Sequence, residues 1–408
     1  MYGIGRAYSP TFIALEETHM PNPWILTDVA AGKYEEKLTI TPPDVGGKAD
    51  GYSIVKKTLR GGLADGVDTI TIDNGKFSFI VLPTRGMSIW KAWLNDAEIG
   101  WQSPVHGPVH PKYVPLNEPS GLGWLDGFDE LLVRCGLESN GAPEFDEESG
   151  RLKYPLHGRI GNKPAQRVEV SVDGDTGEIT LTGVVEESRF HFFKLRLTTT
   201  IKTRPDEPGF RVQDVVENFG GTDGETQMLY HVNFGLPMVD PGSQFVAPIR
   251  TVVPRNDHAA SGLENWQNYP NETPGFEEQV YFLELAAGDD GYTQTLLKNA
   301  HGTGGATLRF NKNKLPCFTV WKNPVAAEDG YVTGLEPGTN FPNPRTYEGE
   351  QNRVVKLPPG KTITYDLQLT VHDDEAGVAE SEKAIAALQA GVETKVYDQP
   401  QKGWCADA

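Results

Sequence analysis

Apolar and polar residues alternate with a period of two through most of the chain. In residues 362–371 five apolar side chains fall on one face, and in residues 166–173 three valines do the same. Residues 192–201 follow the same pattern. This alternation is typical of antiparallel strands that have one face in a core and one face in water. Further segments are strand candidates: 68–72, 76–82, 178–185, 210–217, 279–284, 306–310 and 317–322.

Few segments favour a helix. Residues 375–391 have the composition of a full helix, with Gly391 as its stop, and a shorter helical turn is expected at 126–134. Strands and helices do not alternate along the chain, which argues against doubly wound and TIM-type folds. We therefore expect an all-β fold, one large antiparallel β-sandwich with few short helices.

The same pattern divides the chain into three parts. The run of strands is continuous through residues 51–372, which we expect to form the sandwich domain. Residues 1–50 are expected to be an N-terminal extension that packs on the core, and residues 373–408 a C-terminal helix and tail.

The charge of the chain restricts its partners. Its 408 residues include 37 Lys and Arg against 56 Asp and Glu, a net charge of −19. Nucleic acids and anionic membranes need a basic face, so neither is an expected partner. No run approaches the ~20 apolar residues that span a bilayer, and the N-terminal sequence lacks the features of a signal peptide. Three distant cysteines suggest no disulfide framework, which favours a cytoplasmic location.

Common catalytic signatures are absent from the sequence. It contains no GxGxxG, P-loop, HExxH or GxSxG motif, so nucleotide, zincin and serine-hydrolase chemistry have no support. His106 and His110 are four residues apart, but Gly107 and Pro108 between them oppose the helix that would align them as metal ligands.

Two polar residues lie where apolar ones would be expected. His231 lies in the apolar run 227–235, and Glu336 follows Leu335 at the end of another strand-like run. Each also has an ordinary interpretation, because a histidine in a strand is often a satisfied core residue and a lone glutamate is often a turn acid. Long irregular connections at 101–150 and 251–277 carry histidines, tryptophans and acids, as functional loops often do.

Four segments resemble motifs of the aldose 1-epimerase (galactose mutarotase) superfamily, in the order in which that superfamily has them: LPTRGMSI (82–89), PLHGRIGN (155–162), LYHVNFG (229–235) and GLEPGTNFPNP (334–344). The segments CGLESNGAP (135–143) and VPRNDHAASGLENW (253–266) resemble a less characterised branch of it. The resemblance covers residues 50–372 and implies the galactose mutarotase-like supersandwich, with an aldose as the small-molecule partner.

The resemblance also implies a catalytic pair. Mutarotation removes the proton of the anomeric hydroxyl and protonates the ring oxygen, so one base and one acid suffice without a metal or other cofactor. Glu336 is expected as the base and His231 as the acid, which predicts a bell-shaped dependence of the rate on pH. Residues expected to contact the sugar are Arg85, His157, Arg159, Asn233, Trp124, Trp321 and Lys322. Asp257 and Asp240 are candidates for an aspartate that orients the sugar.

The sequence departs from the superfamily pattern in two places, and other functions stay open. Tyr230 stands where an asparagine precedes the histidine, and Pro337-Gly338 interrupts the glutamate segment. One alternative is a metal-assisted lyase or isomerase that acts on an oxidised sugar and uses His157, His231 and Glu336. Another is a carbohydrate-binding protein without catalysis. No dense cluster of Arg and Lys accompanies the motifs, which disfavours a phosphorylated sugar.

Overall fold

Two β-sheets, a smaller one of ten strands and a larger one of fourteen, make up most of the computed structural model, which describes residues 23–406. The small sheet has ten strands in the order β17 (Gln244–Val246), β20 (Tyr292–Lys298), β21 (Gly305–Asn311), β25 (Thr362–His372), β15 (Gly209–Asn218), β14 (Lys194–Thr203), β13 (Ile179–Ser188), β12 (Ala165–Val172), β1 (Trp24–Asp28) and β2 (Lys33–Tyr34).

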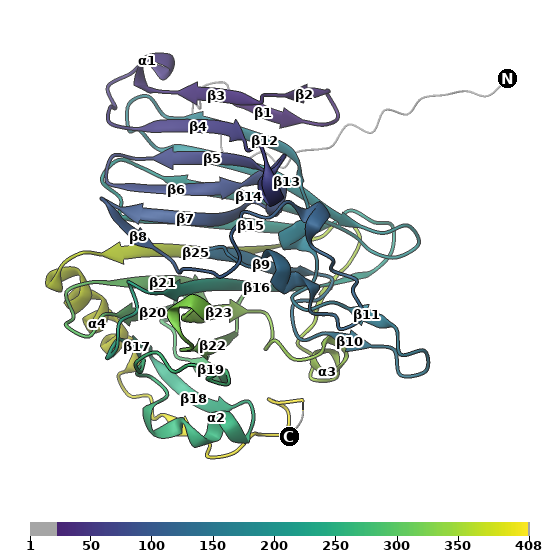
Figure 1. Ribbon diagram of the computed structural model, residues 1–408, viewed down its shortest axis with the longest axis vertical. Helices are drawn as coiled ribbons and strands as arrows, with labels where there is room; N and C mark the ends of the chain where they lie inside the picture. Colours follow the sequence, from purple (N-terminus) through teal and green to yellow (C-terminus); the bar gives the residue numbers. More distant parts are fainter. Residues whose placement is uncertain (1–22, 407–408) are drawn as a thin grey trace.

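The large sheet has fourteen strands and lies against the small one (Figure 1). Its main path runs β26 (Lys395–Val396), β18 (Ile249–Pro254), β19 (Gln279–Leu285), β22 (Cys317–Asn323), β23 (Val332–Gly338), β16 (Gly224–Gly235), β9 (Leu132–Leu137), β7 (Ser88–Leu94), β6 (Phe77–Leu82), β5 (Asp68–Asp73), β4 (Ser53–Thr58) and β3 (Lys37–Ile40). Strand β24 (Val355–Leu357) pairs with β16, and β8 (Ala97–Ile99) pairs with β7. A separate hairpin consists of β10 (Glu144–Phe145) and β11 (Leu152–Tyr154).

The expected all-β sandwich is confirmed. Pairings between named strands in the described residues are antiparallel, except for β18 with β26. One continuous apolar core fills the space between the two sheets, because the inward residues of strands from both sheets are apolar at every second position. Among residues 23–406, no helix is long and apolar enough to cross a membrane.

Helices are few and mostly short: α1 (Pro42–Val45), α2 (Asp257–Ser261), α3 (Arg345–Glu350) and α4 (Glu375–Gln389). The predicted long helix is α4, whose N-terminus is capped by the Asp374 side chain, which accepts the Gly377 N–H at 2.7 Å. The helical turn predicted at 126–134 is wrong in its extent. A 3₁₀ helix ends at Gly127 and β9 begins at Leu132, because this segment joins the large sheet.

Segments near both ends of the described part join the sheets. Residues 1–22 lie outside the described part, but β1 pairs with β12 in the small sheet and β3 pairs with β4 in the large sheet. Part of the region expected as an extension therefore supplies edge strands to both sheets. At the other end, α4 packs on Leu296 of β20, and β26 pairs with β18.

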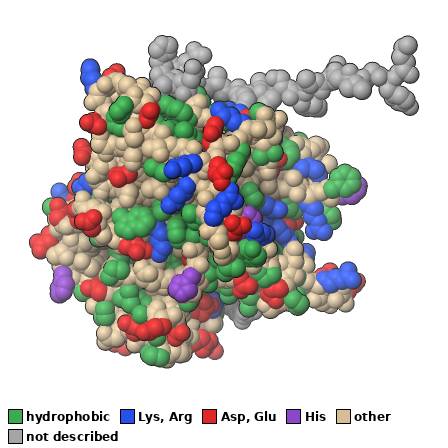
Figure 2. All heavy atoms as spheres, turned by 45° about the horizontal axis from the view of Figure 1, so that its top comes forward, with side chains coloured by type: hydrophobic (Ala, Val, Ile, Leu, Met, Phe, Trp, Pro, Cys, Tyr) green, Lys and Arg blue, Asp and Glu red, His purple; other side chains and the backbone are tan. Residues whose placement is uncertain are grey.

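Charged side chains are unevenly spread over the surface. Figure 2 shows acidic side chains scattered over most of the visible face, whereas Lys and Arg side chains gather between its centre and its right edge. The visible face of this strongly acidic chain thus has a locally basic part.

Candidate active site

The period of two places His231 and Glu336 on the same face of the large sheet. Tyr230 and Val232 of β16 point into the core between the sheets, as does Leu335 of β23. The register pairs Val232 with Leu335, so His231 and Glu336, each one residue away, lie beside each other on the opposite face. Trp124 and Phe128, from the segment between β8 and β9, pack beside His231 on that face.

The two side chains are in direct contact. Nε2 of His231 lies 3.2 Å from Oε1 of Glu336, and the two side chains are only 4% and 2% exposed. A Cβ atom at Gly334 would lie 2.6 Å from Oε1 of Glu336, so the glycine provides the space that the carboxyl group occupies. The pair is therefore buried and closely packed.

Asn233 fixes the tautomer of His231. Its Nδ2 donates to the main-chain oxygen of Glu130 at 2.9 Å, which turns Oδ1 toward Nδ1 of His231 at 2.5 Å. Because Oδ1 only accepts, Nδ1 carries a proton, and in a neutral imidazole Nε2 is left with its lone pair toward Glu336. The carboxyl group must then donate to Nε2.

Burial shifts both members of the pair toward their neutral forms. It raises the pKa of Glu336 well above its usual value, with a further rise from Glu278 and an opposing effect of Arg255. Burial lowers the pKa of His231 well below its usual value, and nearby His157 lowers this pKa further. The sequence-based expectation had the proton on His231, whereas burial favours a protonated Glu336 and a neutral His231.

Aromatic rings surround the pair. The ring of His231 lies 5.2 Å from that of Phe128, 5.5 Å from Trp321 and 6.0 Å from Trp124, measured between centroids. Trp124 and Phe128 are buried, and Trp321 is partly exposed. Such rings provide flat apolar surfaces, and the exposure of Trp321 marks the side that faces solvent.

A tight turn brings His157 to the pair. His157 and Gly158 have φ angles of 56° and 72°, and a Cβ atom on Gly158 would lie 2.0 Å from the oxygen of Ser139. Only glycine fits at residue 158. The His157 ring lies 5.2 Å from the ring of His231, and its Nδ1 donates to the oxygen of Asn140 at 3.0 Å. Burial lowers the pKa of His157 to about 4, so Nε2 is an acceptor at neutral pH.

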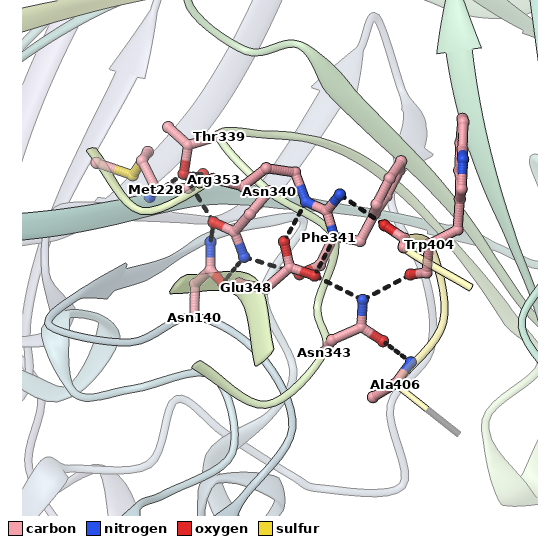
Figure 3. A network of polar contacts seen from close by, with 11 residues as sticks. Asn140, Met228, Thr339, Asn340, Phe341, Asn343, Glu348, Arg353, Trp404 and Ala406 are labelled. Carbon is pink, nitrogen blue, oxygen red and sulfur yellow. Dashed lines mark hydrogen bonds and ion pairs between the residues drawn. The ribbon is translucent and has the colours of Figure 1, made fainter. Parts of the chain in front are cut away.

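Asn140, whose main-chain oxygen accepts from His157, belongs to a buried polar network with the segment after Glu336 (Figure 3). The side-chain amides of Asn140 and Asn340 exchange two hydrogen bonds of 2.9 and 2.8 Å. Farther along the segment, Asn343 donates to the oxygen of Trp404 at 2.8 Å and accepts from the N–H of Ala406 at 3.2 Å. Hydrogen bonds among residues from three distant parts of the chain thus stabilise the segments around the pair.

Arg85 and Lys322 lie apart from the pair. Arg85 is buried, and its guanidinium group donates to Glu130 at 2.7 Å and to the main-chain oxygens of Val109 and Gly127 at 3.0 and 2.9 Å. Arg85 thus links the loops that contain Val109 and Gly127. Lys322 follows Trp321 in β22 and points to the opposite face, where Nζ donates to the oxygens of Trp266 and Asn268 at 2.8 and 2.7 Å. Neither side chain is free for a sugar.

The remaining sequence candidates lie at other positions. Arg159 pairs with Glu138 at 3.0 Å. Asp240 accepts from the Ser243 hydroxyl at 2.6 Å in a turn, and Asp257 is exposed on α2. Within the described residues, no group of three or more His, Cys, Asp or Glu side chains is arranged to hold a metal ion.

Sequence reasoning missed Glu278 as part of the site. Glu278 accepts from the indole N–H of Trp321 at 2.7 Å and pairs with Arg255 at 2.8 Å. Both charged side chains are about two-fifths exposed, at 43% and 37%, so they lie on the solvent side of the pair. In the sequence, Glu278 follows a turn-rich stretch and looks like a surface acid. The one available signal was the indole N–H, which needs an acceptor.

Comparison with known proteins identifies the family. Residues 64–371 match the model of a family described as a domain of unknown function (DUF4432). The chain belongs to the DUF4432 family. No curated protein matches it.

Solved structures place this DUF4432 protein among sugar epimerase folds. It is 36% identical to a protein from Klebsiella pneumoniae subsp. pneumoniae that is provisionally named an aldose 1-epimerase, over 93% of this chain and 99% of that one, with a TM-score of 0.90. A galactose mutarotase-like protein from Clostridium acetobutylicum is 12% identical over 78% and 98% of the two chains, with a TM-score of 0.54. Galactose 1-epimerase from Lactobacillus acidophilus is 12% identical over 79% and 99%, with a TM-score of 0.51. The DUF4432 protein has the galactose mutarotase-like fold.

Proposed function

We propose that this DUF4432 protein interconverts the anomers of a free aldose, with Glu336 and His231 as its proton-transfer groups. The observation that carries the proposal is the contact of 3.2 Å between Nε2 and Oε1 in a pair whose tautomer is set by Asn233. A base oriented by a third group and paired with an acid is a recurring arrangement in proton-transfer enzymes. The likeness to a provisionally named aldose 1-epimerase supports the same reaction class.

In the proposed reaction, ring opening begins from a protonated Glu336 and a neutral His231. Nε2 takes the proton of the anomeric hydroxyl while Glu336 gives its proton to the ring oxygen, and the bond between C1 and the ring oxygen breaks. The product is the open-chain aldehyde beside a glutamate and an imidazolium. Rotation about the bond between C1 and C2, followed by the reverse transfers, closes the ring on the other face. At the end, the pair again holds the one transferable proton with which it began, on Glu336.

The reverse assignment, with Glu336 as base and His231 as acid, uses the same number of protons. The two assignments are therefore kinetically equivalent, and the apparent pKa values belong to the pair. Burial of both groups favours the neutral starting form. We assign Trp321, which is partly exposed beside the pair, to stacking on the sugar ring, and Nε2 of His157 to accepting a sugar hydroxyl.

The test is exchange of α and β anomers, measured by NMR or polarimetry across a panel of aldoses. The wild-type protein is expected to accelerate at least one aldose, with or without EDTA. Glu336→Gln and His231→Gln should each lose about 10²–10⁴-fold of that acceleration. Glu284→Gln, which removes a carboxylate from β19, separated from β23 by β22, is the matched control and should keep the wild-type rate.

Two results would contradict the proposal. In one, no aldose is accelerated. In the other, the acceleration persists in both Glu336→Gln and His231→Gln, which would place the chemistry at another site. Activity that EDTA abolishes would instead favour a metal-assisted lyase or isomerase.

A further inference from the structure

Five cationic side chains line one hollow of this acidic protein. The hollow has a volume of about 730 Å³ and lies between the β10–β11 hairpin and the turn that joins β13 to β14. The five cations come from four separate segments: Arg151 and Lys153, Arg159, Lys163, and Arg189.

Protein carboxylates satisfy only part of this charge. Lys153 pairs with Glu144 at 2.9 Å, and Arg159 pairs with Glu138 at 3.0 Å. Within residues 23–406, none of the ion pairs involves Arg151, Lys163 or Arg189. Cations that share a hollow repel one another unless an anion offsets them. The chain as a whole has 56 acidic residues against 37 basic ones, so five cations around one hollow are a local reversal of its charge.

One buried carboxyl group lies beside the same hollow. Glu187 lines it and is 1% exposed. Its Oε2 accepts the N–H of Leu137 at 2.9 Å, while Oε1 has no hydrogen-bond partner among the described residues. Burial raises the pKa of Glu187 to about 7, so its charge only partly offsets the cations at neutral pH.

We propose that this hollow is a binding site for a small molecule that carries a phosphate, sulfate or carboxylate group. Its volume suits a ligand of sugar size, and Arg side chains bind such oxyanions through paired N–H groups. The net charge of −19 opposes a nucleic acid as the occupant. The sequence showed no such cluster, because residues from four segments meet only in the fold.

The test is isothermal titration calorimetry with sodium sulfate, D-glucose 6-phosphate and D-glucuronate at pH 8 and constant ionic strength. The two sugar probes distinguish a phosphate from a carboxylate source, and D-glucose controls for uncharged sugar that binds beside Glu336. The double variant Arg151→Gln/Lys163→Gln should weaken binding of the anionic probes at least about 10-fold. These two cations have no ion-pair partner in the part of the chain that the structure describes, so the fold is not expected to depend on them.

The control removes two charges elsewhere. Arg204→Gln/Lys314→Gln lowers the net charge equally at exposed positions outside the hollow and should change the affinity less than about twofold. Glu187→Gln should tighten binding at pH 8, because it removes the negative charge that lines the site. Failure of all three anions to bind, an equal loss in both double variants, or no tightening in Glu187→Gln would overturn the proposal. Binding is the readout, so the result is independent of whether the protein proves to be an epimerase.

Discussion

Two buried acid–base pairs lie on opposite faces of the large sheet, and their surroundings differ. In the core between the sheets, Arg134 of β9 makes two hydrogen bonds to Asp214 of β15, at 2.5 and 3.1 Å, and a third to Thr199 at 2.7 Å. The hydroxyl of Tyr230 adds a bond of 2.8 Å to Asp214. On the other face, within residues 23–406, the Glu336 side chain contacts only one polar partner, His231.

The difference distinguishes a pair that stabilises the fold from a pair that can act on a substrate. A fully satisfied pair such as Arg134 and Asp214 has no atom left for a substrate, and its charges are stabilised by one another. The His231–Glu336 pair has unused oxygen positions, shifted pKa values and an aromatic wall that is partly exposed. Burial alone therefore does not mark a catalytic pair, whereas burial with unsatisfied positions beside solvent does.

The largest expected effect concerns stability and the core pair. Asp214→Ala leaves the Arg134 charge buried without its partner and should lower the free energy of unfolding by about 3–5 kcal/mol. Urea denaturation measures this change. The double variant Arg134→Met/Asp214→Ala should recover much of the loss, since it removes the unpaired charge. A single-variant loss below about 1 kcal/mol would mean that the pair is not structural.

The next effect concerns the residue that orients His231. Asn233→Leu removes the acceptor of the Nδ1 proton and should lower kcat about 10–100-fold, with a much smaller change in KM, because the imidazole loses its tautomer and orientation. Anomer exchange at several sugar concentrations separates the two constants. Asn233→Asp keeps an acceptor and should restore part of kcat. Equal rates for Asn233→Leu and the wild type would remove Asn233 from the proposed site.

A smaller effect concerns Lys322 on the core face. Burial lowers the pKa of Lys322 to about 8, so between pH 8 and about 10.5 the unfolded chain binds more protons than the folded protein. Stability from this group therefore rises with pH in that window, by at most about 1.4 kcal/mol per pH unit. Urea denaturation at pH 8 and pH 10 should show this rise in the wild type and not in Lys322→Met. The same slope in both proteins would contradict the assignment.

The smallest expected effect is a weak dependence of the rate on pH. The pKa of Glu336 is raised and that of His231 is lowered, so the form with one proton on the pair spans a wide range. We expect the rate of anomer exchange to change less than about threefold between pH 5.5 and 7. Groups with ordinary pKa values in the form Glu⁻ and His⁺ would give a narrow maximum near pH 5.5 instead. Such a maximum would show that the pair is not desolvated as described.

The sequence allowed most strands to be predicted, because alternation with a period of two reports directly which side of a sheet is buried. It also pointed to His231 and Glu336, since each interrupts an apolar run. The same rule could have separated Lys322 from Trp321, because neighbours in a strand point to opposite faces. Arg85 was different. Its partners at Val109 and Gly127 belong to irregular loops whose path no local pattern gives.

The polar network at Asn343 determines when, during synthesis of the chain, the support of the site can be completed. Asn343 and Arg353 donate to main-chain oxygens of Trp404 and Gly403, both at 2.8 Å. Synthesis proceeds from the N-terminus, and early segments begin to fold first. The strands that carry His231 and Glu336 therefore leave the ribosome before the tail that supports their surroundings. The nascent chain can form its sheets early, but the support of the site is complete only after residues 403–406 have emerged.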